Sequence, residues 1–130
     1  MSAARLTQAA SGDIDAQREL ANLNYSGRYD PGAFTSVCYT EAIVWQRMVA
    51  ARGTLEDRRA LVYLLAEYSG WLSVDEQAAS NHFMAQAVML AEALAEDGDE
   101  LAAGWVASAA DNISADVFLR ARHMREVLAA

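Results

Sequence analysis

Apolar residues recur along this chain at helical spacing, and no segment shows the alternation that marks a half-buried strand. Between Phe34 and Val49, the apolar residues Cys38, Ala42 and Trp45 follow at steps of three or four residues. This spacing places all five on one helical face. The pattern predicts an all-α fold of about seven helices. Their expected ranges are 3–10, 14 or 16 to 26, 33 or 36 to 52, 55–69, 74–97, 101–110 and 115–130.

Capping residues and glycines define the expected helix ends. Thr54 is followed three residues later by Asp57, which makes a partial capping box, and Ser73 is followed by Glu76, which makes a complete one. We therefore expect helices to begin after Thr54 and after Ser73. We expect Gly70 to end the helix that lies between them.

One apolar face on each of the longer helices supplies the expected core. These faces comprise Ala16, Leu20 and Leu23; Phe34, Cys38, Ala42, Trp45 and Val49; Leu61, Leu65 and Tyr68; Phe83, Ala87, Leu90 and Leu94; and Val117, Ala121, Met124 and Leu128. The connections are short, so consecutive helices are expected to pack antiparallel.

The glycines indicate an internal repeat. Gly12, Gly53 and Gly98 each follow an alanine-rich segment, and the two intervals between them are similar in length. The tripeptide Tyr25-Ser26-Gly27 recurs as Tyr68-Ser69-Gly70. A period near 40 residues is typical of helical-hairpin repeats.

At these positions the chain resembles the Sel-one-like repeat family, a branch of the tetratricopeptide class. The resemblance rests on the alanine-rich segment 42–53 and on the pattern from Gly12 through Ala16 to Gly27. The matching positions are Gly12, Ala16, Tyr25, Gly27, Trp45, Gly53, Tyr68, Gly70 and Gly98. The loop after Gly27 is longer than the family's usual one.

The resemblance implies antiparallel helical hairpins stacked as a short right-handed α-solenoid. It predicts a single domain over residues 1–130, with repeats at roughly 3–30, 33–72 and 73–112 and a capping helix at 114–130. It further implies a scaffolding role in protein–protein interaction without catalysis.

Composition narrows the function classes. The chain of 130 residues has 18 acidic and 10 basic residues, for a formal net charge of −8. All the basic residues are arginine, which excludes lysine-dependent chemistry. The acidic balance disfavours nucleic acid and anionic membranes as partners. A single cysteine, Cys38, and a segment Met1–Ala10 without the apolar region of a secretory signal lead us to expect a cytoplasmic location.

Candidate chemistry is sparse. His82 and His123 lack the helical spacing of a metal site, and the acidic run 96–100 is too short for a calcium loop. We therefore expect no enzymatic activity, no metal and no cofactor.

The candidate partner-binding residues are aromatic or arginine side chains at or beside the expected turns or off the apolar faces. They are Arg28, Tyr29, Tyr39, Tyr63 and Trp71. These residues predict contact with a protein partner that the sequence does not identify. Two alternatives stay open. One is a small-molecule-binding bundle built around His82, Glu92 and Glu96, and the other is a regulatory module that forms a homodimer.

Overall fold

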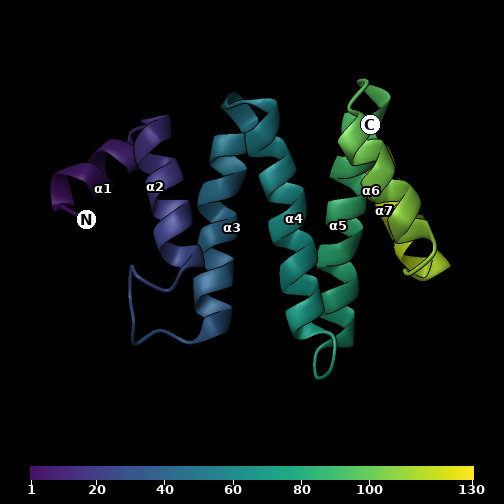
Figure 1. Ribbon diagram of the computed structural model, residues 1–130, viewed down its shortest axis with the longest axis horizontal. Coiled ribbons are helices and arrows are strands. Elements are labelled where there is room, and N and C mark those ends of the chain that lie inside the picture. Colours follow the sequence, from purple (N-terminus) through teal and green to yellow (C-terminus); the bar gives the residue numbers. More distant parts are fainter. The chain divides into compact units, whose positions relative to one another are not determined.

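The computed structural model describes residues 1–130, and all of its regular secondary structure is helical (Figure 1). The seven helices are α1 Ala3–Ala10, α2 Ile14–Tyr25, α3 Thr35–Arg52, α4 Leu55–Leu72, α5 Gln77–Glu96, α6 Glu100–Ala110 and α7 Ala115–Ala129. The predicted all-α class and the predicted number of helices are confirmed. None of the helices combines the length and the hydropathy that a membrane span requires.

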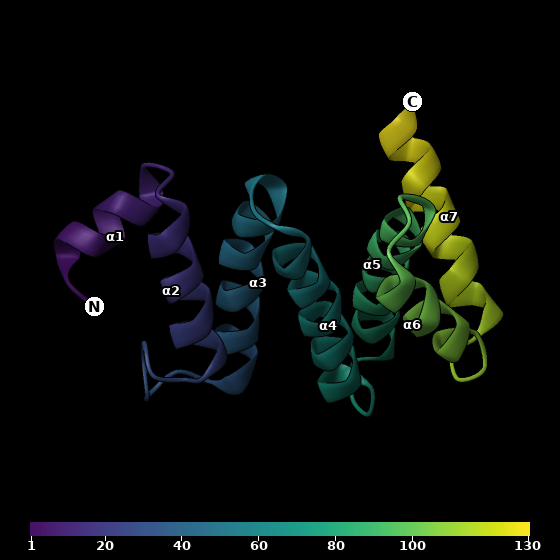
Figure 2. The ribbon, with the colours of Figure 1, turned by 45° about the horizontal axis from the view of Figure 1, so that its top comes forward.

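Contacts within the chain gather in two compact units, Met1–Leu61 and Val62–Ala130. The first unit holds α1, α2, α3 and the beginning of α4, with α2 and α3 packed side by side (Figure 1). The second unit holds the rest of α4 and α5, α6 and α7, with α5 packed against both α6 and α7 (Figure 2).

Small side chains form part of the core of the first unit. Ala9 and Ala16 are fully buried beside Leu20, and the indole of Trp45 packs against this cluster. Alanine lets α1 and α2 approach closely, and the large aromatic ring fills space at native packing density. The predicted inward positions of Ala16, Leu20, Ala42 and Val49 are therefore confirmed.

In the second unit, buried residues of α5 and α7 face one another. Ala85 and Val88 of α5 pack with Val117 and Ala121 of α7. Half-buried hydrophobic side chains surround them, namely Met84, Met89, Trp105, Ile113, Phe118 and Met124. The expected burial of Leu65 and Tyr68 on α4 is also confirmed, as is that of Leu61 at the end of the first unit.

The turns after α1 and α5 share one local structure. Gly12 and Gly98 adopt left-handed φ angles of 105° and 100°, which favour glycine. Asp13 and Asp99 follow, and each side chain accepts a hydrogen bond from the backbone amide three residues on. Each turn thus ends one helix and caps the next.

The prediction that Gly70 ends a helix is wrong, because α4 continues to Leu72. Gly27, in the other copy of the tripeptide, does end α2, with a φ of 73°. The difference lies in what surrounds each glycine. Leu72 is buried and anchors the additional turn, and the buried Ser69 hydroxyl donates to the Ser80 carbonyl at 2.7 Å. Identical tripeptides therefore have different structures.

The predicted capping box at Ser73 does not form either. Helix α5 begins at Gln77, and Glu76 precedes it without a side-chain capping bond. The Ser73 hydroxyl instead donates to the Gly70 carbonyl at 2.8 Å, so it completes the end of α4.

Two expected core positions lie at the surface. Phe34 immediately precedes α3 in extended backbone and is 80% exposed, and Leu128 in the last turn of α7 is 75% exposed. Phe34 lies one turn before the half-buried Cys38, and Leu128 lies one turn after the half-buried Met124. The buried face of each helix is therefore shorter than its apolar sequence pattern predicts.

Alanine substitutions at Gly53 and at Gly70 should have opposite effects on the stability of the fold, because the surroundings of the two glycines differ. An added Cβ at Gly53 would meet the Asp57 carboxylate and lie 2.6 Å from the Val49 carbonyl oxygen. Gly53→Ala should therefore destabilise the fold by about 1–3 kcal/mol. Gly70 is helical with open space around it, so Gly70→Ala should stabilise the fold by about 0.5–1 kcal/mol. Urea unfolding measures both, and a Gly53→Ala variant as stable as the wild type would contradict the first expectation.

Candidate functional site

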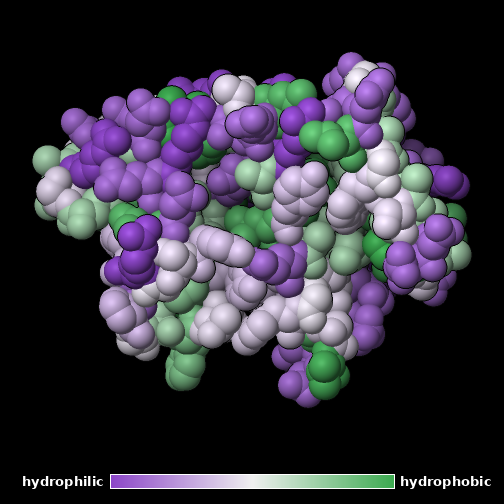
Figure 3. Space-filling view, in the orientation of Figure 1, coloured by the Kyte–Doolittle hydropathy of each residue, from purple (hydrophilic) through white to green (hydrophobic).

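The five predicted partner-binding residues lie in both units. Arg28, Tyr29 and Tyr39 belong to the first unit, and Tyr63 and Trp71 belong to α4 in the second. Four of them are exposed, with Tyr29, Tyr63 and Trp71 at 43%, 47% and 49%, while Tyr39 is half-buried. Hydrophobic side chains also reach the surface among hydrophilic ones on the face drawn in Figure 3.

In the first unit, aromatic side chains are exposed or half-buried along the segment in which α2 ends and α3 begins. We use the name 25–39 patch for these side chains and the neighbouring arginine, namely Tyr25, Arg28, Tyr29, Phe34 and Tyr39. The rings of Tyr25 and Tyr39 meet edge to face, with centroids 6.3 Å apart. The sequence pattern predicts Tyr25 as a repeat position and Phe34 as a core residue. The position of Phe34 just after the Pro31-Gly32 turn was the signal that it precedes the helix.

The loop of this patch is held by backbone hydrogen bonds. The left-handed Gly27 lets the amides of Arg28 and Tyr29 both donate to the Leu23 carbonyl, at 2.9 and 3.1 Å. The Asp30 side chain accepts from the backbone amide two residues on at 3.1 Å, as in an Asx turn. The exposed aromatic side chains therefore project from an ordered loop.

In the second unit, three exposed residues follow one side of α4. We call Tyr63, Glu67 and Trp71 the α4 stripe, because they are spaced four residues apart. The buried ring of Tyr68 stacks on the Trp71 indole, with centroids 6.0 Å apart and an interplanar angle of 16°. Tyr68 in turn contacts Phe83 of α5 at 4.9 Å between centroids. The Trp71 indole is thus held in place by packing against the buried Tyr68 ring.

A groove of about 280 Å³ lies between α5 and α7. Its lining is formed by His82, Gln86, Met89, His123, Met124, Val127 and Leu128. The His82 ring nitrogen Nε2 lies 3.0 Å from the Gln86 amide nitrogen. Sequence reasoning did not predict that both histidines would line one groove, since nothing in a single sequence pairs residues of separate helices.

The polar residues considered for small-molecule chemistry do not form a joint site. Glu96 is held by Arg125 in two parallel hydrogen bonds of 2.7 and 2.6 Å, and this pairing lowers the pKa of Glu96. One oxygen of Glu92 is buried without a hydrogen-bond partner. No group of three or more His, Cys, Asp or Glu side chains is placed to hold a metal ion.

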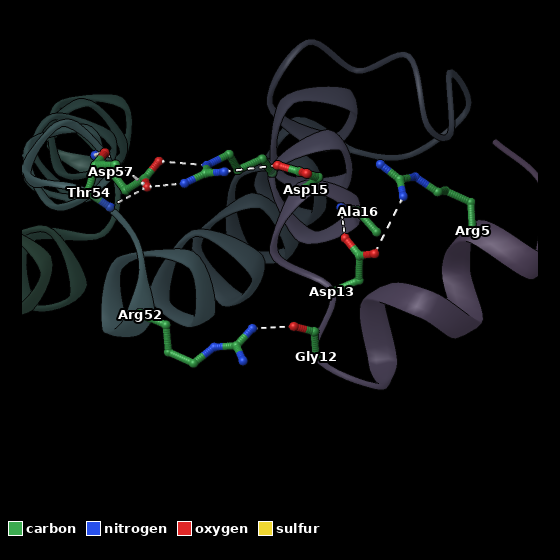
Figure 4. Close-up of polar contacts among 9 residues, drawn as sticks. Arg5, Gly12, Asp13, Asp15, Ala16, Arg52, Thr54 and Asp57 are labelled. Atoms are coloured by element: carbon green, nitrogen blue, oxygen red, sulfur yellow. Dashed lines mark hydrogen bonds and ion pairs between the residues drawn. The ribbon is translucent and has the colours of Figure 1, made fainter.

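The most connected polar group is Asp57, at the start of α4 in the first unit (Figure 4). Arg18 of α2 donates to both carboxylate oxygens, at 3.0 and 2.6 Å. The Thr54 amide donates to the same carboxylate at 2.7 Å, which confirms the predicted capping pair. The Gln46 side chain of α3 donates to the Asp57 backbone carbonyl at 2.9 Å.

These partners keep Asp57 ionised. The Arg18 hydrogen bond contributes most and, with the Thr54 bonds, lowers the pKa of Asp57 from 3.8 to about 2 against the opposing effect of burial. Two neighbouring contacts lie nearer the surface, where Arg5 forms an ion pair with Asp13 and Arg52 donates to the Gly12 carbonyl (Figure 4). Each of these groups is paired within the chain, so the cluster is structural.

Comparisons of the chain with protein-family models, with curated proteins and with solved structures find no match.

Lowering the pH should reduce the free energy of unfolding, because Asp57 becomes protonated and loses its charge. Its pKa is lower in the folded chain than in the unfolded one, so its contribution is complete above pH 4 and is lost as the pH falls toward 2. The side chain is 13% exposed, and we expect a loss of about 1–2 kcal/mol. Arg18→Met should remove most of this dependence. Arg28→Met makes the same charge change at a side chain bonded to the Ser26 hydroxyl, and it should leave the pH profile unchanged. Denaturant unfolding of the wild type and both variants between pH 2 and pH 4 measures this dependence. The same pH dependence in Arg18→Met and Arg28→Met would contradict the role of the Arg18–Asp57 pair.

Proposed function

We propose that the chain is a non-catalytic protein-interaction module built on tetratricopeptide-like helical repeats. The observation that carries the proposal is the exposure of large aromatic side chains on ordered backbone. Tyr25, Tyr29, Phe34, Tyr63 and Trp71 keep between 43% and 80% of their surface exposed. Aromatic residues and arginine are enriched at the energetic centres of protein interfaces.

Local structure supports the repeat part of the proposal. The glycine turn with its aspartate cap occurs after α1 and again after α5, at positions that the repeat alignment pairs. Trp45, which the resemblance places in the first helix of a repeat, packs on the alanines of the preceding hairpin. One free cysteine suits a reducing compartment, and we propose that the module acts in the cytoplasm.

The 25–39 patch is the first place to test this function. A double variant, Tyr29→Ala with Phe34→Ala, should reduce recovery of a stoichiometric protein partner about tenfold in cross-linked capture from native lysate. Both side chains are exposed, so the melting temperature should change little. Leu101→Ala removes another exposed apolar side chain, 59% exposed, and should leave recovery unchanged. Equal recovery with all three proteins would count against the proposal.

The groove between α5 and α7 favours a second candidate function, the binding of a small apolar molecule. Its volume of about 280 Å³ is close to the lower end of typical ligand pockets, about 300 Å³. Methionine and aliphatic side chains dominate its lining, and imidazole and amide groups supply polar contacts. The same surface could serve a homodimer, and light scattering distinguishes these two outcomes.

Leu128→Glu tests the groove directly. The side chain is 75% exposed, so the charge should leave folding intact while disfavouring an apolar occupant. We expect a co-purifying small molecule, detected by native mass spectrometry of the wild type, to be lost in the variant. Leu119→Glu, at 59% exposure and outside the groove lining, is the matched control. Retention of the molecule by both variants would exclude the groove.

A further inference from the structure

No carboxylate and no guanidinium lines the groove between α5 and α7. The residues from Met1 to Leu61 contain seven acidic and seven basic side chains, whereas those from Val62 to Ala130 contain eleven acidic and three basic ones. The groove thus belongs to a strongly acidic unit, yet its own lining excludes these charges. A charged ligand would lose water there without gaining an ion pair. The groove is therefore suited to an uncharged molecule.

Each of the two helices contributes one imidazole and one thioether to this lining. His82 and Met89 belong to α5, and His123 and Met124 belong to α7. His82 and Met89 are seven residues apart, so the α5 wall extends over about 10 Å. The groove volume of about 280 Å³ equals the volume of about nine water molecules in the liquid. These dimensions fit a molecule of one or two fused rings.

Packing within the second unit holds these groups in place. The His82 ring meets the Phe83 ring edge to face, with centroids 5.4 Å apart and an interplanar angle of 81°. Met89 and Met124 are half-buried and pack against the buried residues that join α5 to α7. A ligand therefore meets walls that the fold has already positioned, which reduces the ordering cost of binding.

The chemistry of the walls favours an aromatic ligand over an aliphatic one. Methionine sulfur makes favourable contacts with aromatic rings, and the flexible methionine side chain adapts to the outline of its partner. Imidazole is flat and stacks on other flat rings. The exposed His123 imidazole can also exchange a hydrogen bond with a polar group at the edge of a ligand.

We propose that the groove between α5 and α7 binds an uncharged, planar aromatic molecule of one or two fused rings that carries a polar group such as a hydroxyl. The inference rests on the second candidate function, small-molecule binding by this groove, and it names the chemical class of the ligand. The ring system contacts the thioethers of Met89 and Met124, and the polar group bonds to His123.

The test uses the full chain with isotope-labelled methionine methyl groups and two probes that share one carbon skeleton. Naphthol is planar and aromatic, and decalol is its fully saturated counterpart with the same hydroxyl group. In an NMR titration, naphthol should cause ring-current shifts of the Met89 and Met124 methyl signals. The signal of Met48, which lies in the first unit, should not move. We expect naphthol to bind about fivefold more tightly than decalol.

Two matched substitutions separate aromatic contact from apolar burial. Met124→Leu keeps the apolar bulk and removes the sulfur, so it should weaken naphthol binding about threefold and leave decalol binding unchanged. Met48→Leu makes the same change at a side chain that is 43% exposed in the first unit, and it should alter neither affinity. Circular dichroism checks that both variants are folded.

The outcomes distinguish the ligand class from the candidate function. Equal affinities for naphthol and decalol, or equal losses of both with Met124→Leu, would overturn the aromatic class while small-molecule binding by the groove would still stand. Binding of neither probe, or equal shifts of the Met48 and Met124 signals, would overturn the inference and also count against small-molecule binding by the groove.

Discussion

One residue, Asp57, joins three helices of the first unit. Asp57 lies where the chain leaves Gly53 and begins α4, and it links the first turn of that helix to both α2 and α3. A negative side chain at a helix N-terminus is favourable by itself. Here the same carboxylate also accepts hydrogen bonds from the Arg18 guanidinium of α2, so one side chain both caps α4 and holds it against a neighbouring helix. The close approach of its oxygen explains why position 53 has no Cβ.

The second unit is built differently. Its helices meet through small and branched apolar side chains, and the polar contacts that accompany them join hydroxyls and carbonyls more than charges. Ser69 and Ser80 donate to each other's backbone carbonyls at 2.7 and 2.8 Å in a buried pair, which fixes α4 against α5. Acidic side chains are left at the surface of this unit, beside exposed aromatic rings.

Much of the fold could be predicted from the sequence, because helical periodicity and aspartate caps act within a few residues. The turns at Gly12 and Gly98 follow this local logic. The end of α4 cannot be predicted in this way. Its continuation past Gly70 depends on the burial of Leu72 and on the hydrogen bond from the Ser69 hydroxyl to the Ser80 carbonyl. The candidate partner-binding residues could likewise be predicted only in part from the sequence. Tyr29 and Trp71 could be selected as residues off the apolar faces, but the exposure of Phe34 and the stacking on Tyr68 depend on tertiary packing.

The unequal distribution of charge makes the two units respond oppositely to ionic strength. In the first unit, acids and bases balance and several are paired, so screening by added salt weakens attraction. In the second, excess acidic side chains repel one another, so screening relieves repulsion and favours the compact state. Lower ionic strength therefore strengthens attraction between charges in the first unit, and higher ionic strength weakens repulsion between charges in the second. The ionic strength thus shifts the balance of electrostatic energy between the two halves of the chain.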